Sequence, residues 1–380
     1  MAPHITASLI VPIFNGQRYL PQFWESLQAS LQSDYELIVV NDASNEDVLA
    51  TIPSFPMAAA VTTLINEAPL GYAPSVNRAM TQAAGEYLIH LNTDLILLPS
   101  TLRQILSALA TRARVGVVGA KLVYPQTGLT QHVGMAFSDC NKFHFLHYLP
   151  QSHPLVSMSR EVQATTGAIL GFRRSLYEAL GPMDESLYNC NEDIDYCLRA
   201  RRAGYSIMVD AKAVAYHWEG QSGHARFVRA IENEAIFWGK WLKAISPDLH
   251  LYIKESIEHL LRGAAAPDLA TATVINLSKG NADRYVLEAI SSLLGSRRPL
   301  SEMKFLQVNN PDSRYWLPLL LPYSLLRFPS PFVYVVDCYR SLAENYYWFT
   351  KRMDLVGNEV VVDHTGCVLL SSDLLSQTVC

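Results

Sequence analysis

The sequence predicts an α/β fold with a mostly parallel central sheet, because strand and helix patterns alternate through its first hundred residues. Short runs rich in β-forming apolar residues predict strands at 8–14, 35–40, 62–65 and 86–91. Runs with apolar residues at helical spacing predict helices at 19–31, 73–84 and 99–113. Strands that alternate with helices in this way usually pair in parallel, with the helices covering the sheet.

The region from 115 to 245 is less regular and predicts a smaller set of elements. Strands are expected at 115–118, 120–124, 165–172, 205–209 and 213–217, and helices at 174–180 and 191–203. The segment 137–159 is rich in His, Phe and Pro and is expected to be a mobile loop.

Composition excludes several classes of protein. The chain has 380 residues, 49% apolar and 17% charged, which is typical of two or three globular domains. A formal net charge of -5 gives no electrostatic case for binding nucleic acid. Six cysteines without a Cys-x-x-Cys pair, and no signal-peptide pattern at the start, predict a cytoplasmic protein with reduced thiols. The apolar segment 316–336 contains four prolines, which disfavours a membrane span but leaves a peripheral membrane contact open.

Two polar clusters follow predicted strands, where ligands bind in parallel sheets. Asn92 and Asp94 stand two residues apart, so their side chains share one side of the backbone and could hold a metal ion beside phosphates. Asp42 could contact a base or a ribose. Asn and Asp are also ordinary turn residues, so turn formation is the alternative explanation for both clusters, and the favoured one for Asn92 and Asp94 taken alone.

Two further features are open to two interpretations. Glu192, Asp193 and Asp195 head a predicted helix, where acids either compensate the helix dipole or include a general base. His217 follows a predicted strand and is either a hydrogen-bonded residue or a metal ligand.

Six ordered blocks together resemble glycosyltransferase family 2, the inverting sugar transferases with the GT-A fold. The blocks are LIVPIFNGQRYL (9–20), YELIVVNDAS (35–44), LGYAPSVNRAM (70–80), GEYLIHLNTDLIL (85–97), TTGAILGFRRSLYEALGPMDESLYNCNEDIDYCLRARRAGY (165–205) and VAYHWEG (214–220). Asn-Thr-Asp stands in place of the commoner Asp-x-Asp, as in rhamnosyltransferase-like members. One carboxylate fewer leaves metal dependence less certain than the fold.

The resemblance implies a role for each matching residue. The donor side would include Pro12, Asn15, Asp42, Asn77, Asn92 and Asp94, and the acceptor side Thr166 and Gly167. Asp94 and His217 would hold a divalent metal, Mn²⁺ or Mg²⁺, on the diphosphate. Asp193 would be the catalytic base, with Glu192 beside it.

The implied function is inverting transfer of one sugar from a nucleotide-diphosphate sugar to a hydroxyl group. The acceptor would be a glycan or a lipid-linked glycan in bacterial surface glycan synthesis, at or near the inner membrane face. The chain has no Gln-x-x-Arg-Trp motif, which favours single transfer over processive synthesis. Two alternatives stay open: a nucleotidyltransferase that makes sugar nucleotides, and a non-catalytic protein that binds glycans or nucleotides. The sequence leaves the sugar, the nucleotide and the oligomeric state open.

The expected domains are a GT-A domain at 1–245, a helical linker at 246–270 and a partial, inactive GT-A-like repeat at 271–380. The repeat is expected because 6–30 aligns with 271–296, and 85–100 with 357–372. On this alignment Asp42 falls on Asn310 and Asp94 on Gly366, so the copy has lost both donor carboxylates. The alternative is that two common strand–helix–strand patterns look alike.

Overall fold

The computed structural model divides the chain into two compact units, each described here by itself. The first contains Met1–Met135 and Pro150–Ile245, and the second contains Ala136–Leu149 and Ser246–Cys380. The structure describes residues 4–137, 142–146, 150–218, 229–248, 251–252, 255, 272–276, 304–307, 332–336, 361–363 and 367–371. Most of the expected linker at 246–270 lies outside these residues.

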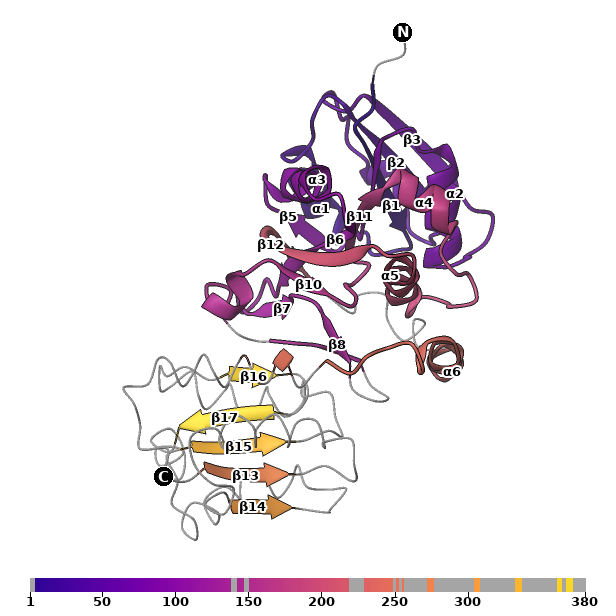
Figure 1. Cartoon of the computed structure of the whole chain (residues 1–380). Coiled ribbons are helices and arrows are strands. Elements are labelled where there is room, and N and C mark those ends of the chain that lie inside the picture. Colours follow the sequence, from indigo (N-terminus) through magenta and orange to yellow (C-terminus); the bar gives the residue numbers. More distant parts are fainter. Residues whose placement is uncertain are drawn as a thin grey trace. The chain divides into compact units, whose positions relative to one another are not determined.

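A ten-stranded sheet forms the centre of the first unit (Figure 1). Its main path runs β10-β12-β6-β11-β4-β1-β2-β3, while β5 pairs with β12 and β7 pairs with β6. The strands are β1 (Ala7–Ile13), β2 (Tyr35–Asn41), β3 (Ala60–Ile65), β4 (Tyr87–Leu91), β5 (Leu95–Leu97), β6 (Val115–Val123), β7 (Thr130–His132), β10 (Arg160–Val162), β11 (Ile169–Arg173) and β12 (Ser206–His217).

The sheet is mixed around a parallel centre. β1 pairs in parallel with β2 and β4, and β2 pairs in parallel with β3. β11 is inserted antiparallel between β4 and β6, and β12 is again parallel to β6. The predicted α/β class with a mostly parallel central sheet is therefore confirmed.

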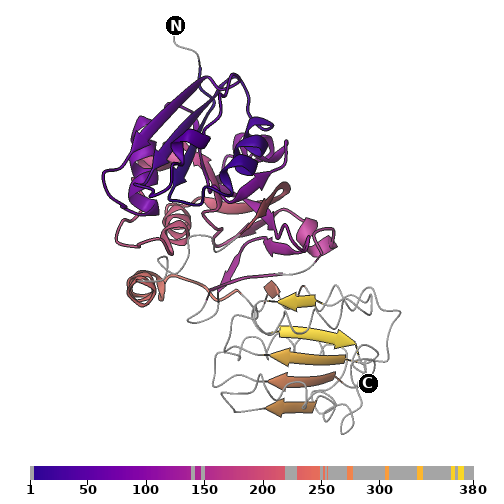
Figure 2. The same ribbon diagram turned by 180° about the vertical axis from the view of Figure 1, so that it is seen from behind.

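Helices cover both faces of this sheet (Figures 1 and 2). They are α1 (Leu20–Gln28), α2 (Tyr72–Gln82), α3 (Thr101–Thr111), α4 (Arg174–Leu180) and α5 (Glu192–Arg202). Helix α6 (Ala230–Trp241) lies off the sheet and contacts α5, where Trp241 binds Asp195 (Figure 1). α1 buries Leu20, Phe23, Trp24 and Leu27, which form one stripe at helical spacing. This stripe and the apolar face of α3 pack in one core with alternate residues of β1 and β2, such as Leu9 and Leu37.

Three predictions for the middle of the chain were wrong in detail. The two strands expected around Gly119 are one strand, β6, and those expected on either side of 210–212 are one bulged strand, β12. Gly119 does not break its strand; a Cβ atom there would lie 2.0 Å from Thr165 Oγ1, so glycine permits close packing. The expected mobile loop at 137–159 contains strand β9 (Lys142–His144), which pairs with β8 (Met135–Phe137), and the short helix η2 (Pro154–Ser157).

The second unit contains a five-stranded sheet with the order β14-β13-β15-β17-β16. Its strands are β13 (Ala272–Asn276), β14 (Lys304–Gln307), β15 (Phe332–Val336), β16 (Val361–Asp363) and β17 (Cys367–Ser371). Across the parts of both units that the structure describes, no helix is long and apolar enough to span a membrane.

His90 is a buried imidazole in the middle of β4. It is fully buried, packs edge-on against the rings of Tyr72 and Phe172, and both ring nitrogens lack a hydrogen-bond partner. Burial lowers the pKa of His90 to about 3, because the apolar surroundings disfavour the charged imidazolium. In the unfolded chain this residue binds a proton at a pH near 6.5.

The low pKa of His90 makes the fold sensitive to acid. Between about pH 6.5 and pH 3 the unfolded state binds the proton and the folded state does not, so stability falls as pH falls. From pH 7 to pH 5 this contribution amounts to about 2 kcal/mol. We expect His90→Leu to remove about that much of the acid dependence, measured by chemical denaturation at both pH values. An equal loss of stability in wild type and variant would contradict the assignment.

Candidate active site

Four of the polar residues predicted on the donor side, Asn15, Asp42, Asn92 and Asp94, follow the carboxyl ends of β1, β2 and β4. Asn15 follows β1, its backbone N–H donates to Ser44 Oγ at 2.9 Å, and its Oδ1 accepts from the backbone N–H of Asn45 at 2.8 Å. Pro12 lies within β1, opposite Val40 of β2. The side chains of Asn15 and Ser44, which follow β1 and β2, therefore connect the ends of these two strands.

Asp42 is buried and holds the chain that leads into α2. Its Oδ1 accepts from Asn66 Nδ2 at 2.7 Å and from the backbone N–H of Leu70 at 2.8 Å. Its Oδ2 accepts from the backbone N–H of Gly71 at 2.8 Å. A carboxylate has about four lone-pair sites, so these three bonds leave Oδ2 able to accept one more. Asp42 is thus a structural anchor with one remaining acceptor site.

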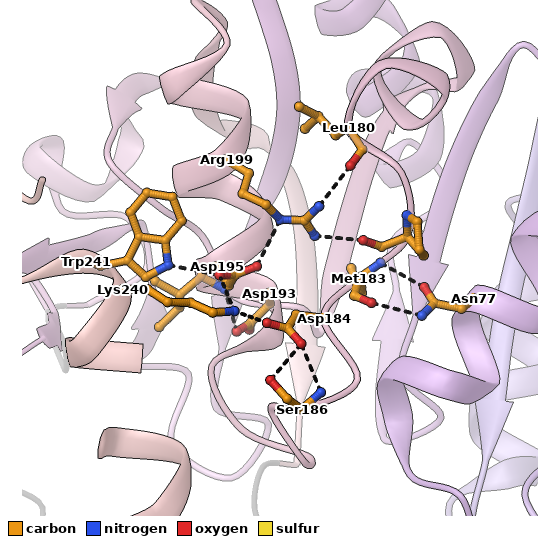
Figure 3. A network of polar contacts seen from close by, with 12 residues as sticks. Asn77, Leu180, Met183, Asp184, Ser186, Asp193, Asp195, Arg199, Lys240 and Trp241 are labelled. Carbon is orange, nitrogen blue, oxygen red and sulfur yellow. Dashed lines mark hydrogen bonds and ion pairs between the residues drawn. The ribbon is translucent and has the colours of Figure 1, made fainter. Parts of the chain in front are cut away.

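Asn77 on α2 binds the turn that follows α4. Its Nδ2 donates to the backbone carbonyl of Met183 at 2.9 Å, and its Oδ1 accepts from Met183 N–H at 2.8 Å (Figure 3). Its Nδ2 also donates to Glu185 Oε1 at 2.8 Å. These bonds use both N–H groups of the side-chain amide. Asn77 therefore acts on the site by fixing this turn against α2.

Asp94 and His217, which the resemblance assigns to a metal, lie together in the structure. His217 Nε2 is 3.2 Å from Asp94 Oδ1, and the backbone N–H of Trp218 donates to the carbonyl of Asp94 at 3.0 Å. The pairing of β5 with β12 explains this, because Leu95, directly after Asp94, is in register with His217. Two residues that are 123 positions apart thus share one site.

Gln131 on β7 fixes the orientation of the His217 ring. Its Oε1 lies 2.7 Å from His217 Nδ1, and its Nε2 donates to the backbone carbonyl of His217 at 3.5 Å. An amide oxygen can only accept, so Nδ1 carries the proton and a neutral His217 presents a lone pair at Nε2. Without a proton or a metal cation between His217 Nε2 and Asp94, the Nε2 lone pair would face the Asp94 carboxylate, so two hydrogen-bond acceptors would face each other.

The Asp94–His217 pair fits a divalent cation that is also bound by a diphosphate. Two ligands at about 2.1 Å from an octahedral metal, at right angles, lie about 3.0 Å apart. Carboxylate and imidazole together suit Mn²⁺ better than Mg²⁺, which prefers oxygen ligands alone. No group of three or more His, Cys, Asp or Glu side chains that could hold a metal occurs among the described residues, so phosphate or water oxygens would complete the shell.

Asp193, the predicted base, lies at the start of α5 and contacts the segment before β11. Its Oδ2 accepts from the backbone N–H of Gly167 at 2.5 Å, and its Oδ1 accepts from Ile194 N–H at 2.7 Å. A Cβ atom on Gly167 would lie 3.0 Å from Asp193 Cβ, so glycine permits this approach. Thr166, beside it, is half-buried, and its N–H lies 3.4 Å from His132 Nε2.

Tyr72 is a further residue at this point, and the sequence analysis assigned it no role. Its hydroxyl donates to the backbone carbonyl of Gly167 at 3.1 Å. Burial raises the pKa of Tyr72 well above its usual value, and the negative charges of Glu192 and Asp193 raise it further. The hydroxyl therefore stays protonated and remains a donor. The one sequence signal for this role was the position of Tyr72 in the block 70–80, at the start of a predicted helix.

The three acids of α5 have different environments. Glu192 is buried, and Asp193 is partly exposed and faces Gly167. Asp195 is 1% exposed and accepts from Arg199 Nε and from Trp241 Nε1, both at 2.9 Å (Figure 3). Asp195 is therefore committed to an internal ion pair, which leaves Asp193 as the acid available for proton transfer.

Helix α6 holds the segment that leads into α5, and the sequence analysis did not find it. Lys240 forms an ion pair with Asp184 of the turn after α4 (Figure 3). The side chain of Asn233 donates to Tyr188 C=O at 2.7 Å and accepts from Tyr188 N–H at 3.1 Å. Together with Trp241, these contacts brace the loop before Asp193 from the side away from α2.

Comparison with known proteins shows what the chain is similar to. The model of the glycosyl transferase family 2 matches residues 8–181, so the resemblance to that family is confirmed for this part of the chain. The chain is 32% identical over 249 residues to the uncharacterized protein y4gI of Sinorhizobium fredii (strain NBRC 101917 / NGR234), and 30% identical over 240 residues to the O-antigen biosynthesis protein RfbC of Myxococcus xanthus. Each alignment covers 61% of this chain, but only 27% of y4gI and 18% of RfbC.

Two solved structures show a more distant likeness. One is the mannosyltransferase PcManGT from Pyrobaculum calidifontis in complex with GDP-Man and Mn²⁺, with a TM-score of 0.48 and 16% identity. The likeness covers 78% of this chain and 82% of that one. The other is S. aureus TarS 1–349, with a TM-score of 0.42 and 14% identity over 91% and 92% of the two chains.

The bond between Gln131 and His217 predicts a role for Gln131 in cation binding. Partners that orient a metal-binding histidine typically change affinity 10- to 100-fold when they are removed. We expect Gln131→Leu to weaken Mn²⁺ binding by about this factor in the presence of a nucleoside diphosphate, measured by titration calorimetry. Gln82→Leu, an exposed change at the end of α2, is the control and should have no effect. Equal affinities for Gln131→Leu and wild type would rule this role out.

The different environments of Asp193 and Asp195 predict different effects of the same substitution. Asp195→Asn removes the charge that pairs with Arg199 in a buried site, and should lower the free energy of unfolding by about 2 to 3 kcal/mol. Asp193→Asn keeps an oxygen that accepts from Gly167 N–H, and should lower it by about 1 kcal/mol or less. Urea denaturation compares the two. The reverse order would show that Asp193 is the structural acid.

Proposed function

We propose that the protein is an inverting glycosyltransferase that moves one sugar from a nucleoside-diphosphate sugar to an acceptor hydroxyl. The observation that carries the proposal is a three-residue segment, Thr166–Ala168, that contacts both halves of the site. The Gly167 N–H binds Asp193, and the Ala168 carbonyl accepts from the backbone N–H of Asn92 at 2.9 Å. The proposed base and the proposed metal loop thus share one support.

Asp193 is the general base of this proposal. Each of its oxygens accepts one backbone hydrogen bond and has a further lone pair, so it can take a proton from an acceptor hydroxyl. The acceptor oxygen attacks the anomeric carbon from the side opposite the nucleotide and forms the new C–O bond. The bond from the anomeric carbon to the diphosphate oxygen breaks with its electron pair, so the configuration inverts.

Asp94 and His217 hold a divalent cation against the donor diphosphate in this proposal. When bound, the cation neutralises negative charge that develops on the leaving diphosphate. Gln131 keeps the Nε2 lone pair of His217 directed at the cation. Asn92 contributes its backbone bond to Ala168 and an amide oxygen near the same loop end, consistent with a weaker metal site than two carboxylates would give.

The rest of the donor side acts by positioning. Asp42 anchors the start of α2, and its remaining acceptor site is open to an N–H of the base or a hydroxyl of the ribose. Asn77 fixes the turn at 183–185. We assign the acceptor to glycans or lipid-linked glycans of a bacterial surface, with RfbC, an O-antigen biosynthesis protein, as the supporting relative. A peripheral position at the inner membrane face remains a prediction.

Donor hydrolysis tests the proposed function without a known acceptor. Wild type is incubated with UDP-, dTDP- and GDP-sugars, with and without Mn²⁺ or Mg²⁺, and released nucleoside diphosphate is recorded. We expect one nucleotide class to be turned over in a cation-dependent reaction. Asp193→Asn should reduce turnover by about 10²- to 10⁴-fold, because a general base contributes that much to a rate.

The control for this test is Glu178→Gln, which removes an exposed acid of α4 and should leave turnover unchanged. Once a donor class is known, the anomeric configuration of the transferred sugar is read by NMR against that of the donor. Retention of configuration, or full activity of Asp193→Asn, would contradict the mechanism.

A further inference from the structure

Asn189 lies in the loop before α5 and binds the start of α2. Its Oδ1 accepts from the backbone N–H of Tyr72 at 2.6 Å, across 117 positions of the chain. Tyr72 is the first residue of α2, so its N–H has no acceptor within the helix. Gly71, which precedes it, has no side chain that could cap the helix. Asn189 therefore supplies the cap from a distant part of the sequence.

The start of α2 is also bonded to the donor side of the site. The backbone N–H of Gly71 donates to Asp42 Oδ2 at 2.8 Å. A Cβ atom on Gly71 would lie 2.8 Å from Tyr188 Cε2 and 3.0 Å from Asn189 Oδ1, so glycine permits the loop before α5 to approach α2 closely. The start of α2 therefore contacts both Asp42 and the loop that leads to Asp193.

Tyr72 also holds the second segment that contacts Asp193. Its hydroxyl donates to the carbonyl of Gly167 at 3.1 Å, and the N–H of Gly167 donates to Asp193 Oδ2 at 2.5 Å. Glycine rotates easily about both of its backbone torsions, so the peptides on its two sides need separate contacts. Tyr72 fixes the peptide after Gly167, and Asp193 binds the peptide before it. Tyr72 thus connects Asn189, four residues before Asp193, with the glycine that binds Asp193 directly.

The loop before α5 has a backbone conformation that few residue types adopt. Asn189 has a φ of 52° and Asn191 a φ of 74°, both in the left-handed region. Asn enters this region more readily than most other residues with a side chain, but at some cost in free energy. Asn191 is held by a bond of its own, from Nδ2 to Glu234 Oε1 at 3.0 Å. The bond to Tyr72 N–H does the same for Asn189.

We propose that Asn189 is a positioning residue for Asp193. By accepting from Tyr72 N–H it fixes the loop before α5, and through the Tyr72 hydroxyl it fixes the Gly167 peptide that binds the carboxylate. The inference rests on the proposed function, in which Asp193 is the general base. Asn189 contacts neither substrate in this scheme, so its loss should slow the chemical step and leave nucleotide binding unchanged.

Two substitutions of Asn189 separate the hydrogen bond from the backbone conformation. Asn189→Gly removes the acceptor but adopts a φ of 52° without strain. Asn189→Asp keeps an acceptor oxygen and tolerates the same conformation. We expect kcat for donor turnover to fall by about 10- to 100-fold in Asn189→Gly and to stay within about 3-fold of wild type in Asn189→Asp. The Kd of the nucleoside diphosphate with Mn²⁺ should stay within about 3-fold of wild type in both.

The effect should depend on the presence of Asp193. In the Asp193→Asn background, Asn189→Gly should lower the remaining turnover by less than about 2-fold, because residues that act as a unit are not additive. A full further loss in that background would show that Asn189 acts by another route and would overturn the proposal. Ser186→Gly is the matched control, since it places a glycine at an exposed position between α4 and α5, and it should leave turnover unchanged.

Amide hydrogen exchange tests the positioning without any turnover. In Asn189→Gly we expect the N–H of Gly167 to exchange at least about 10-fold faster than in wild type, and in Asn189→Asp at the wild-type rate. Tyr72→Phe, which lacks the hydroxyl bonded to Gly167, should show the same faster exchange. Circular dichroism and thermal melting show that each variant is folded.

The exchange data separate this inference from the proposed function. Unchanged protection of Gly167 in Asn189→Gly would overturn the positioning role, whether or not the protein transfers a sugar. Faster exchange of Gly167 together with full activity of Asp193→Asn would contradict the proposed function and still support the connection from Asn189 to Gly167.

Discussion

The hydrogen bond from Gly167 N–H to Asp193 is the constraint on which the candidate active site depends. It joins the start of α5 to the segment before β11, and that segment also binds the Asn92 loop through the carbonyl of Ala168. Because β11 is inserted antiparallel beside β4, its start lies at the carboxyl end of β4. The inserted strand thus brings the proposed base, from late in the chain, close to the proposed metal loop, from early in it.

The second constraint is electrostatic. With the proton of His217 held on Nδ1 by Gln131, the Nε2 lone pair faces a carboxylate at 3.2 Å. Two hydrogen-bond acceptors that face each other in this way suit a metal cation bound between them. Around it, the site is braced on two sides: Asn77 of α2 holds the turn after α4, and Trp241 of α6 binds Asp195. These contacts hold the segment around Asp193 in place without involving the Asp193 carboxylate.

The sequence predicted the strands well where a pattern was local. The strand at 35–40 could be predicted together with the polar residues after it. The apolar run and the turn residues that end it lie within ten residues of each other. The sequence could not choose between Asp193 and Asp195, since both head the same helix and only tertiary contacts commit Asp195 to Arg199. Gln131 and the bracing residues of α6 were missed because they act through partners more than 40 residues away. The partial repeat expected at 271–380 stays a prediction, because most of these residues lie outside the part of the chain that the structure describes.

The central claim is that Asp94 with His217 holds the donor and Asp193 performs proton transfer in one site. Nucleotide binding and turnover measured on the same preparations separate these roles. We expect Asp94→Ala to lose Mn²⁺-dependent nucleotide binding together with turnover, and Asp193→Asn to keep binding within about 3-fold while turnover falls by at least about 10²-fold. Loss of binding in Asp193→Asn, or normal turnover in Asp94→Ala, would contradict the account.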